Sequence, residues 1–401
     1  MNPLGVARDV WKRLAPLEVR ERAAPLIEPA ARAYQRMAAR KHWSDTPGDG
    51  PIRVVGFMTG SHGIAAGAKL TARALQAVGA EVETIGVSFT DVSWREPIHA
   101  RPAAPAWIFQ LNPPELVGAL SALAIHPQGP RFGYWAWELP QAPRRWLKDA
   151  IVVSEIWAPS RHTAEAFAGA DRPVRVAPHP LFMEDYEGVS PRARTAGFMA
   201  VALCDLNSSE ARKNPSGAIE AFRRAFGGDP GARLVVKTQN GAAHPEQLAA
   251  LKAAAGSNVE VIDATWPYAE VLGLIAAADV LISLHRAEGF GLPLAEAMAL
   301  GTPVIATGWS ANLDFMDETT GVLIPAQIVP VRDPQGVYVG QQWADPDVDT
   351  AAEALRRLRS RPQWRAELAA AARARVARQL SPQAWFDGLP EAVKRTVAAA
   401  G

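Results

Sequence analysis

The chain has 401 residues, a length that suits two α/β domains better than a single core. Its 42 Lys and Arg residues balance 41 Asp and Glu residues, so no overall charge indicates a nucleic-acid partner. The single cysteine, Cys204, excludes an internal disulfide framework and a cysteine-based zinc site. No apolar run reaches the roughly 18 residues of a membrane-spanning helix, and the first residues do not resemble a secretory signal. We therefore expect a cytoplasmic protein.

Residues 1–50 are expected to form a helical extension and a linker. The segment is amphipathic and basic, with nine basic and four acidic residues up to Lys41. One interpretation is peripheral contact with an anionic membrane, at its inner face. The other is a pair of helices packed on the domain that follows. The prolines at positions 16, 25 and 29 interrupt the pattern and favour this second interpretation.

Residues 51–183 are predicted to form a Rossmann-like domain. An apolar run at 52–58, a glycine-containing turn at 59–63, a helix and a second strand follow one another in the order of a βαβ unit. Further strands are expected at Trp107–Leu111, Arg131–Trp135, Ile151–Trp157 and Val174–Ala177.

A second α/β alternation, at 197–380, follows a polar connection at 184–196. Its expected strands are Phe198–Cys204, Arg233–Lys237, Val259–Ile262, Val280–Leu284, Pro303–Ala306 and Gly321–Ile324. Two successive doubly wound units predict two Rossmann-like domains that face a central cleft. Residues 381–401 are expected as a helical tail, and the Pro- and Gly-containing stretch at 325–342 as a loop that shapes specificity.

The stretch from His285 to Gly301 carries the strongest functional signal. It follows a buried strand, and open α/β sheets bind their ligands at such carboxyl ends. Its glycines permit a close approach of the backbone, and the free N–H groups of the following helix suit a diphosphate. The donor-binding candidates of this loop are Gly289, Phe290, Gly291 and Leu292.

Two carboxylates flank this turn. Glu288 stands in the loop beside whatever is bonded to the diphosphate, and Glu296 lies along the helix on the side of a ribose. Carboxylates accept hydrogen bonds from sugar hydroxyls, so the pair is suited to hold a sugar and a ribose. The alternative is two surface glutamates around a tight turn, which the glycines and the preceding strand disfavour.

These residues resemble a known family. Glu288 and Glu296, with Gly-Phe-Gly-Leu-Pro-Leu-Ala between them, look like the E-x7-E signature of glycosyltransferase family 4, retaining enzymes of the GT-B fold. The resemblance is clear from about residue 200 to residue 324 and weaker over 52–180. It implies that Glu288 contacts the donor sugar and that Glu296 contacts the ribose.

A pair of cations, Arg212 and Lys213, precedes a helix just after the first strand of the second domain. A basic residue at this place holds the diphosphate in the family, so we assign both to the leaving group. A solvated surface pair is the alternative. Many family members have Gly-Arg at the start of this loop, where this chain has Asp205-Leu206. Which of the two cations contributes more to holding the diphosphate therefore stays open. Lys237, at the end of the next strand, is a further donor-site candidate.

The first domain offers weaker candidates. His62 and Gly63 lie in the turn that faces the donor phosphates in the family, although a lone glycine turn is weak evidence. Acceptor-binding candidates follow two of the predicted strands. Their aromatic rings could stack on sugar rings. An equal alternative is that these aromatic residues only pack together as a corner of the core. These candidates are Asn112, Trp135, Trp137 and Glu138.

The resemblance predicts transfer of a hexose from a nucleoside-diphosphate sugar to a hydroxyl of a glycan or lipid-linked acceptor. No Asp-x-Asp metal motif is apparent, so we expect no metal and no cofactor beyond the nucleotide-sugar co-substrate. The rivals are a nucleotide-sugar epimerase of the same fold and a non-catalytic nucleotide-sugar binding protein. A nicotinamide dehydrogenase lacks its glycine fingerprint here.

Overall fold

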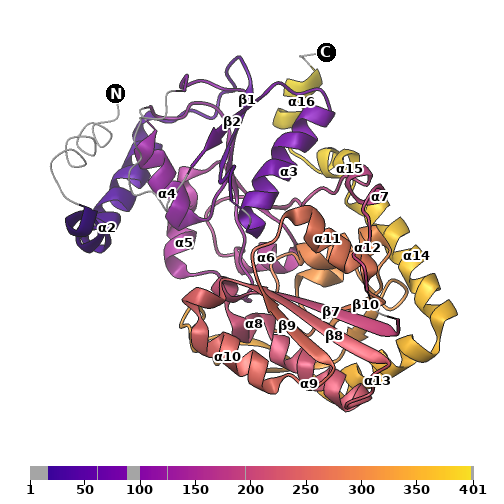
Figure 1. Ribbon diagram of the computed structural model, residues 1–401. Coiled ribbons are helices and arrows are strands. Elements are labelled where there is room, and N and C mark those ends of the chain that lie inside the picture. Colours follow the sequence, from indigo (N-terminus) through magenta and orange to yellow (C-terminus); the bar gives the residue numbers. More distant parts are fainter. Residues whose placement is uncertain (1–16, 61, 88–99, 124, 195, 399–401) are drawn as a thin grey trace. The chain divides into compact units, whose positions relative to one another are not determined.

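A computed structural model describes residues 17–60, 62–87, 100–123, 125–194 and 196–398 (Figure 1). The chain divides into two compact units. The first unit comprises Met1–Trp137, Gln141–Pro180 and Pro382–Gly401, and the second comprises Glu138–Pro140 and Leu181–Ser381. None of the described helices is long and apolar enough to cross a lipid bilayer.

The first unit is built on a six-stranded parallel sheet in the order β2-β1-β3-β4-β5-β6. Its strands are β1 Ile52–Gly56, β2 Val82–Gly86, β3 Trp107–Gln110, β4 Arg131–Tyr134, β5 Glu155–Ala158 and β6 Val174–Val176. Its helices are α2 Leu17–His42, α3 Gly63–Ala77, α4 Pro113–Ala122, α5 Arg144–Asp149, η1 Ala150–Val152, α6 Arg161–Ala166, α15 Pro382–Asp387 and α16 Glu391–Ala398. The predicted strands therefore form one doubly wound sheet.

Helix α2 packs on this unit. It continues through Pro25 and Pro29 without the expected interruption, because each proline removes only one backbone donor from a helix that is held elsewhere. Its second half contacts α4 and η1, and the buried carboxylate of Asp149 forms ion pairs with Arg32 and, at 3.1 Å, with Arg36. The packed interpretation therefore fits residues 28–42. Residues 1–16 lie outside the described residues, and their contact with a membrane stays a prediction.

The second unit repeats the architecture with the strand order β12-β11-β10-β7-β8-β9, all parallel. Its strands are β7 Phe198–Asp205, β8 Ala232–Gln239, β9 Val259–Asp263, β10 Val280–Ser283, β11 Val304–Thr307 and β12 Val322–Ile324. Its helices are α7 Glu184–Glu187, η2 Leu206–Ser208, α8 Glu210–Lys213, α9 Pro215–Phe226, η3 Gly241–Ala243, α10 Pro245–Ala254, α11 Tyr268–Ala277, α12 Leu292–Leu300, η4 Ala311–Asp314, α13 Val348–Ser360 and α14 Pro362–Gln379.

This strand order determines where the loops with the functional candidates lie. The chain runs outward from β7 through β8 to β9 and then returns to the other side of β7 to form β10. The strand order reverses between β7 and β10, and ligands of open α/β sheets bind at such a switch point. The two segments with the strongest functional signal follow these two strands, so their positions in the sheet bring them together.

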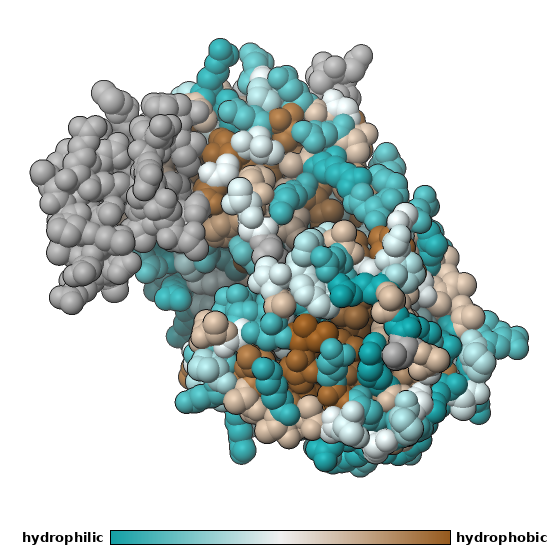
Figure 2. Space-filling model, viewed as in Figure 1, coloured by the Kyte–Doolittle hydropathy of each residue, from teal (hydrophilic) through white to brown (hydrophobic). Residues whose placement is uncertain are grey.

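Two cores cover the faces of this sheet. The strands read as continuous apolar runs because helices cover both faces. Apolar side chains nevertheless reach the surface over β7, β8 and β9 on the face of the second unit shown in Figure 2.

The stretch at 325–342 is a loop only over residues 331–341, because strands form at its two ends. Strands β13 Ala326–Pro330 and β14 Gln342–Pro346 pair antiparallel and form a separate two-stranded hairpin. The residues of β13 are partly or fully exposed, so this strand lacks the alternating apolar pattern of a half-buried strand. The predicted tail also has a definite place, because Trp385 of α15 meets Trp157 of β5 edge to face, with ring centroids 6.3 Å apart.

Candidate active site

Two loops at the switch point are tied together by their backbones. The turn after β7 contains Ser209 and Asn214, both with positive φ, at 59° and 51°. The Asn214 amide donates to the Leu284 carbonyl at 2.8 Å, and the backbone N–H of Arg286 donates to the carbonyl of Arg212 at 2.7 Å. These bonds fix the turn that bears the two predicted cations against the loop that bears the first predicted glutamate.

Glu288, Arg212 and Lys213 form one ion cluster. The Lys213 ammonium lies 2.5 Å from one Glu288 oxygen, and the Arg212 guanidinium lies 3.3 Å from the other. Arg212 also donates to the Ala287 carbonyl at 2.8 Å and to the Ser208 carbonyl at 3.1 Å. Only 4% of the Arg212 side chain is exposed, so the guanidinium is held rigidly rather than solvated. Glu288 balances one of the two positive charges, and the carboxylate of Glu138 lies 3.9 Å from the Arg212 guanidinium.

The environment of Glu288 decides its protonation. Burial alone would raise the pKa of this carboxyl, but the charges of Lys213 and Arg212 outweigh it and lower the pKa to about 2. Burial would lower the pKa of Arg212, whereas the negative groups around it, Glu288 among them, raise it. Both groups are therefore charged at neutral pH. Glu288 is a hydrogen-bond acceptor there and not a proton donor.

Helix α12 starts next to this cluster. Gly291 caps it in the left-handed conformation, with φ of 89°, and Pro293 follows within the first two helical positions. The backbone N–H of Glu288 donates to the Ser310 hydroxyl at 3.1 Å, and Ser310 itself has a φ of 75°. The positive end of the helix dipole is thus aimed at the ion cluster, which is the arrangement that binds a phosphate group.

Glu296 lies farther along α12 and is only 4% exposed. Its carboxylate accepts a hydrogen bond from the hydroxyl of Tyr268, the first residue of α11. Burial raises the pKa of Glu296 to about 7, although the bond from Tyr268 lowers it. Sequence reasoning missed Tyr268, because nothing in its local pattern distinguishes it from an ordinary first residue of a helix.

Lys237 has a structural role in this structure. Its ammonium donates to the carbonyls of Thr238, at 2.8 Å, and Ala264, and it lies 5.0 Å from the centre of the Trp266 ring. Burial lowers its pKa. These contacts place Lys237 beneath the loop that leads into α11, and not in the ion cluster of Glu288.

His285 is a further residue that sequence reasoning did not assign. Its ring is fully buried, at 3.1 Å from the Ser283 hydroxyl and 3.2 Å from the amide oxygen of Asn312. Burial lowers its pKa, so the ring is neutral at neutral pH. Thr307 donates to the His285 carbonyl at 2.6 Å. His285 therefore holds the loop of Glu288 through buried hydrogen bonds.

The β13–β14 hairpin reaches the same turn. Asp333 accepts a hydrogen bond from the Ser209 hydroxyl at 3.0 Å, and Gln335 accepts one from the Glu210 N–H at 3.1 Å. Tyr338 donates to Glu138 at 2.9 Å, and Glu138 lies 3.9 Å from Arg212. The hairpin thus contacts the turn of Arg212 through Asp333 and Gln335, and its Tyr338 binds Glu138 next to the cluster.

The other first-domain candidates occupy different settings. His62 caps α3 by accepting the Ala65 N–H at 3.4 Å, and Gly63 is the exposed first residue of that helix. Asn112 accepts the N–H of Ala136 at 2.8 Å. The rings of Trp135 and Trp137 are buried against Phe167 and Trp146, respectively. That packing favours the aromatic corner over a sugar-stacking surface.

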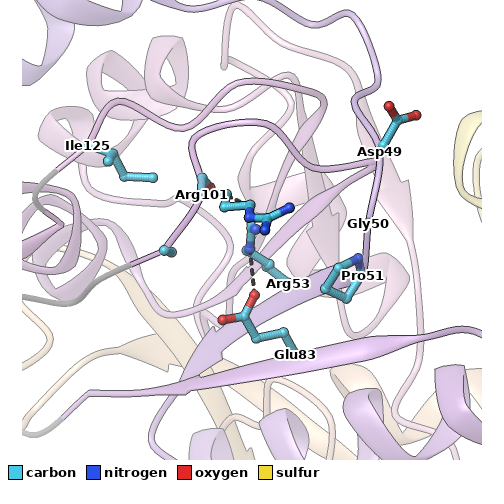
Figure 3. Close-up of a pocket in the computed structure, with 8 residues that line it drawn as sticks. Asp49, Gly50, Pro51, Arg53, Glu83, Arg101 and Ile125 are labelled. Atoms are coloured by element: carbon cyan, nitrogen blue, oxygen red, sulfur yellow. Dashed lines mark hydrogen bonds and ion pairs between the residues drawn. The ribbon is translucent and has the colours of Figure 1, made fainter.

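A pocket of about 540 Å³ lies within the first unit (Figure 3). Its lining residues lie near the amino ends of β1 and β2, whereas open sheets bind ligands at the carboxyl ends of their strands. The Arg53 guanidinium at its centre is already paired with Glu83 at 2.8 Å and donates to the carbonyls of Arg101 and Ala103.

Residues 203–328 match the family model of the glycosyl transferases group 1. This segment contains the ion cluster and Glu296. A curated relative, the D-inositol 3-phosphate glycosyltransferase of Streptosporangium roseum, is 33% identical over 174 residues. That match covers 41% of this chain and 36% of the relative, so the chain matches little more than a third of that protein.

Two solved structures resemble the chain over most of its length. The α,α-trehalose 6-phosphate synthase of Burkholderia multivorans has a TM-score of 0.61 at 12% identity and covers 88% of this chain and 99% of its own. Anabaena HepE, solved in complex with UDP and glucose, has a TM-score of 0.59 at 14% identity, with coverages of 87% and 99%. The likeness shows the fold, which is two Rossmann-like units of the GT-B type.

Proposed function

We propose that this protein is a retaining glycosyltransferase of family 4. It moves a hexose from a nucleoside-diphosphate sugar to a hydroxyl of a glycan or lipid-linked acceptor, in the synthesis of a surface polysaccharide. The ion cluster of Glu288, Arg212 and Lys213 at the amino end of α12 carries this proposal. The match of residues 203–328 to a glycosyltransferase family supports it.

Arg212 and Lys213 act on the leaving group. When the bond between the anomeric carbon and the diphosphate breaks, its electron pair goes to the diphosphate oxygen. The two cations and the dipole of α12 stabilise the charge that develops there. We also propose that this reaction needs no metal ion, because these groups supply the positive charge themselves.

The two glutamates hold the donor. Glu288, ionised and fixed between two cations, accepts hydrogen bonds from hydroxyls of the donor sugar. Glu296 accepts them from the ribose. In this assignment Glu288, in the loop before α12, and Glu296, on the helix, correspond to the two ends of a nucleoside-diphosphate sugar. The complex of HepE with UDP and glucose is consistent with such a donor in this fold.

The first experiment is a thermal-shift and calorimetric screen of the full chain against UDP, GDP, ADP and their hexose conjugates. A nucleotide present at 100 times its dissociation constant adds roughly 2.7 kcal/mol of stability. We expect one base to stabilise the protein and Glu296→Ala to lose that shift. Glu220→Gln, which changes an exposed glutamate of α9, is the matched control.

The second experiment uses the selected donor with a panel of glycan and polyprenyl-linked acceptors. We expect acceptor-dependent release of the nucleoside diphosphate, and NMR of the product should show the anomeric configuration of the donor. An epimerised free sugar formed without acceptor, or binding of none of the nucleotides, would contradict the proposal.

A further inference from the structure

Tyr268 lies where a ligand of Glu296 would lie. Its hydroxyl donates to the Glu296 carboxylate, which is only 4% exposed, while Tyr268 as a residue is 56% exposed. Tyr186, itself buried, is the other polar neighbour of the Tyr268 hydroxyl. A buried carboxylate is thus satisfied by an aromatic residue that has much of its surface in solvent.

We propose that Tyr268 is a placeholder for the ribose of the donor nucleotide, and that a ribose hydroxyl displaces its hydroxyl from Glu296. The inference rests on the proposed function, which assigns Glu296 to the ribose. A phenol hydroxyl and a ribose hydroxyl are both single O–H donors, so each makes the same hydrogen bond to a carboxylate.

The free protein needs such a placeholder. A buried carboxylate without a hydrogen-bond partner costs free energy, and the Tyr268 hydroxyl removes that cost while no nucleotide is bound. Burial also raises the pKa of Glu296, which would favour its neutral form, whereas the bond from Tyr268 opposes this change. Tyr268 therefore keeps the carboxylate available as an acceptor.

The position of Tyr268 permits displacement. It is the first residue of α11 and follows Pro267, whose φ of −52° sets the entry of the chain into the helix. Because more than half of the residue is exposed, rotation of the ring away from α12 gives up little buried apolar surface. A ribose has two neighbouring hydroxyls. One of them replaces the hydrogen bond that Tyr268 loses, and the other is a second donor.

The placeholder has a consequence for selectivity. A nucleotide with ribose hydroxyls must break the Tyr268 bond before it forms its own, whereas a nucleotide without them leaves Tyr268 in place. Tyr268 therefore reduces the difference in affinity between the two kinds of nucleotide. Removal of its hydroxyl alone should increase that difference.

The test is isothermal titration of the full chain with UDP, GDP and ADP and with their 2′,3′-dideoxy forms. We compare the wild type, Tyr268→Phe, and Tyr34→Phe, a matched control on α2 in the first unit. We expect Tyr268→Phe to bind the ribonucleotide about 3- to 10-fold more tightly, as loss of one competing hydrogen bond implies. The dideoxy form should bind with unchanged or lower affinity, and Tyr34→Phe should match the wild type.

A double-mutant cycle with Glu296→Ala provides the second measurement. The placeholder acts through the Glu296 acceptor, which alanine lacks, so Tyr268→Phe should have no effect on ribonucleotide affinity in the Glu296→Ala background. Equal changes for both nucleotide forms, or weaker ribonucleotide binding by Tyr268→Phe, would overturn the inference. The proposed function fails separately, if the wild type binds none of the nucleotides.

Discussion

Lys213 and Glu288 are 75 residues apart in the sequence, and their charged atoms lie 2.5 Å from each other. The contact joins the turn after β7 to the loop after β10, across the point where the strand order reverses. Glu288 shares its other oxygen with Arg212, at 3.3 Å. One carboxylate thus orients two cations, and Glu138 lies 3.9 Å from Arg212 as a second negative group.

Lys213→Met removes one of the two cations. Arg212 continues to pair with Glu288, so we expect the variant to remain folded, with a loss in the free energy of unfolding below ~2 kcal/mol. Removal of one group that stabilises developing charge typically costs 10²- to 10³-fold in rate, so kcat with the selected donor should fall by about 100-fold or more. Lys252→Met, which changes an exposed lysine of α10, controls for a general loss of charge. Unchanged kcat in Lys213→Met would remove the leaving-group assignment.

Glu288 should make the protein sensitive to acid. Its pKa in the folded state is about 2, below the ordinary value of 4.5, so the unfolded state binds more protons in this interval. The contribution of Glu288 to stability is therefore fully present above pH 4.5 and is lost as the pH falls toward 2. Urea unfolding of the wild type and Glu288→Gln at pH 3, 4, 5 and 7 measures it. The difference in stability between the two proteins should shrink below pH 4.5.

Glu296 should have the opposite effect. Burial raises its pKa to about 7, so the folded state binds more protons than the unfolded state between pH 4.5 and 7. The free energy of unfolding should fall as the pH rises through this window, by ~3 kcal/mol for this group alone. Glu296→Gln should remove that slope, as followed by urea unfolding at pH 5, 6, 7 and 8. Glu246→Gln, an exposed glutamate of α10, should keep it.

The hairpin contact of Asp333 makes it a positioning residue for the cations. Asp333 accepts hydrogen bonds from the Ser209 hydroxyl and from three backbone N–H groups of its own hairpin, those of Gln335, Val337 and Tyr338. Asp333→Ala should release the turn of Arg212 and weaken donor binding, raising KM about 10-fold with a smaller change in kcat. Asp171→Ala, in an exposed loop of the first unit, is the control. A change in thermal stability with unchanged KM would show that Asp333 serves the hairpin alone.

Local patterns predicted the parts of the site that lie next to each other in the sequence. Glu288 and Glu296 occupy one loop and one helix, so the glycines and the preceding strand are sufficient to select them as candidates. The hydrogen bond of Tyr268 to Glu296 joins two helices, and a single side chain of that kind has no periodic signal. The same limit applies to Tyr338 and Glu138, whose contact joins residues 200 positions apart.

The aromatic residues near Trp135 show a different limit. A tryptophan at a strand end serves equally well as a core residue or as a sugar-stacking surface, because both uses need the same apolar face. Burial alone separates the two uses, and burial depends on Phe167 and Trp146, which approach from distant positions. The hairpin at 326–346 was missed because its exposed first strand does not alternate between apolar and polar residues.

Asp149 should anchor helix α2 on the first unit. Its side chain is completely buried and pairs with Arg32 and Arg36, and Arg32 is only 8% exposed. Removal of one partner of a buried ion pair leaves an uncompensated charge, so Asp149→Asn should cost about 3–5 kcal/mol in the free energy of unfolding. Asp349→Asn breaks an exposed pair with Arg224 and should cost less than about 1 kcal/mol. Urea unfolding measures both, and limited trypsin digestion should cut within α2 much faster in Asp149→Asn. Equal digestion rates in the two variants would show that other contacts hold this helix.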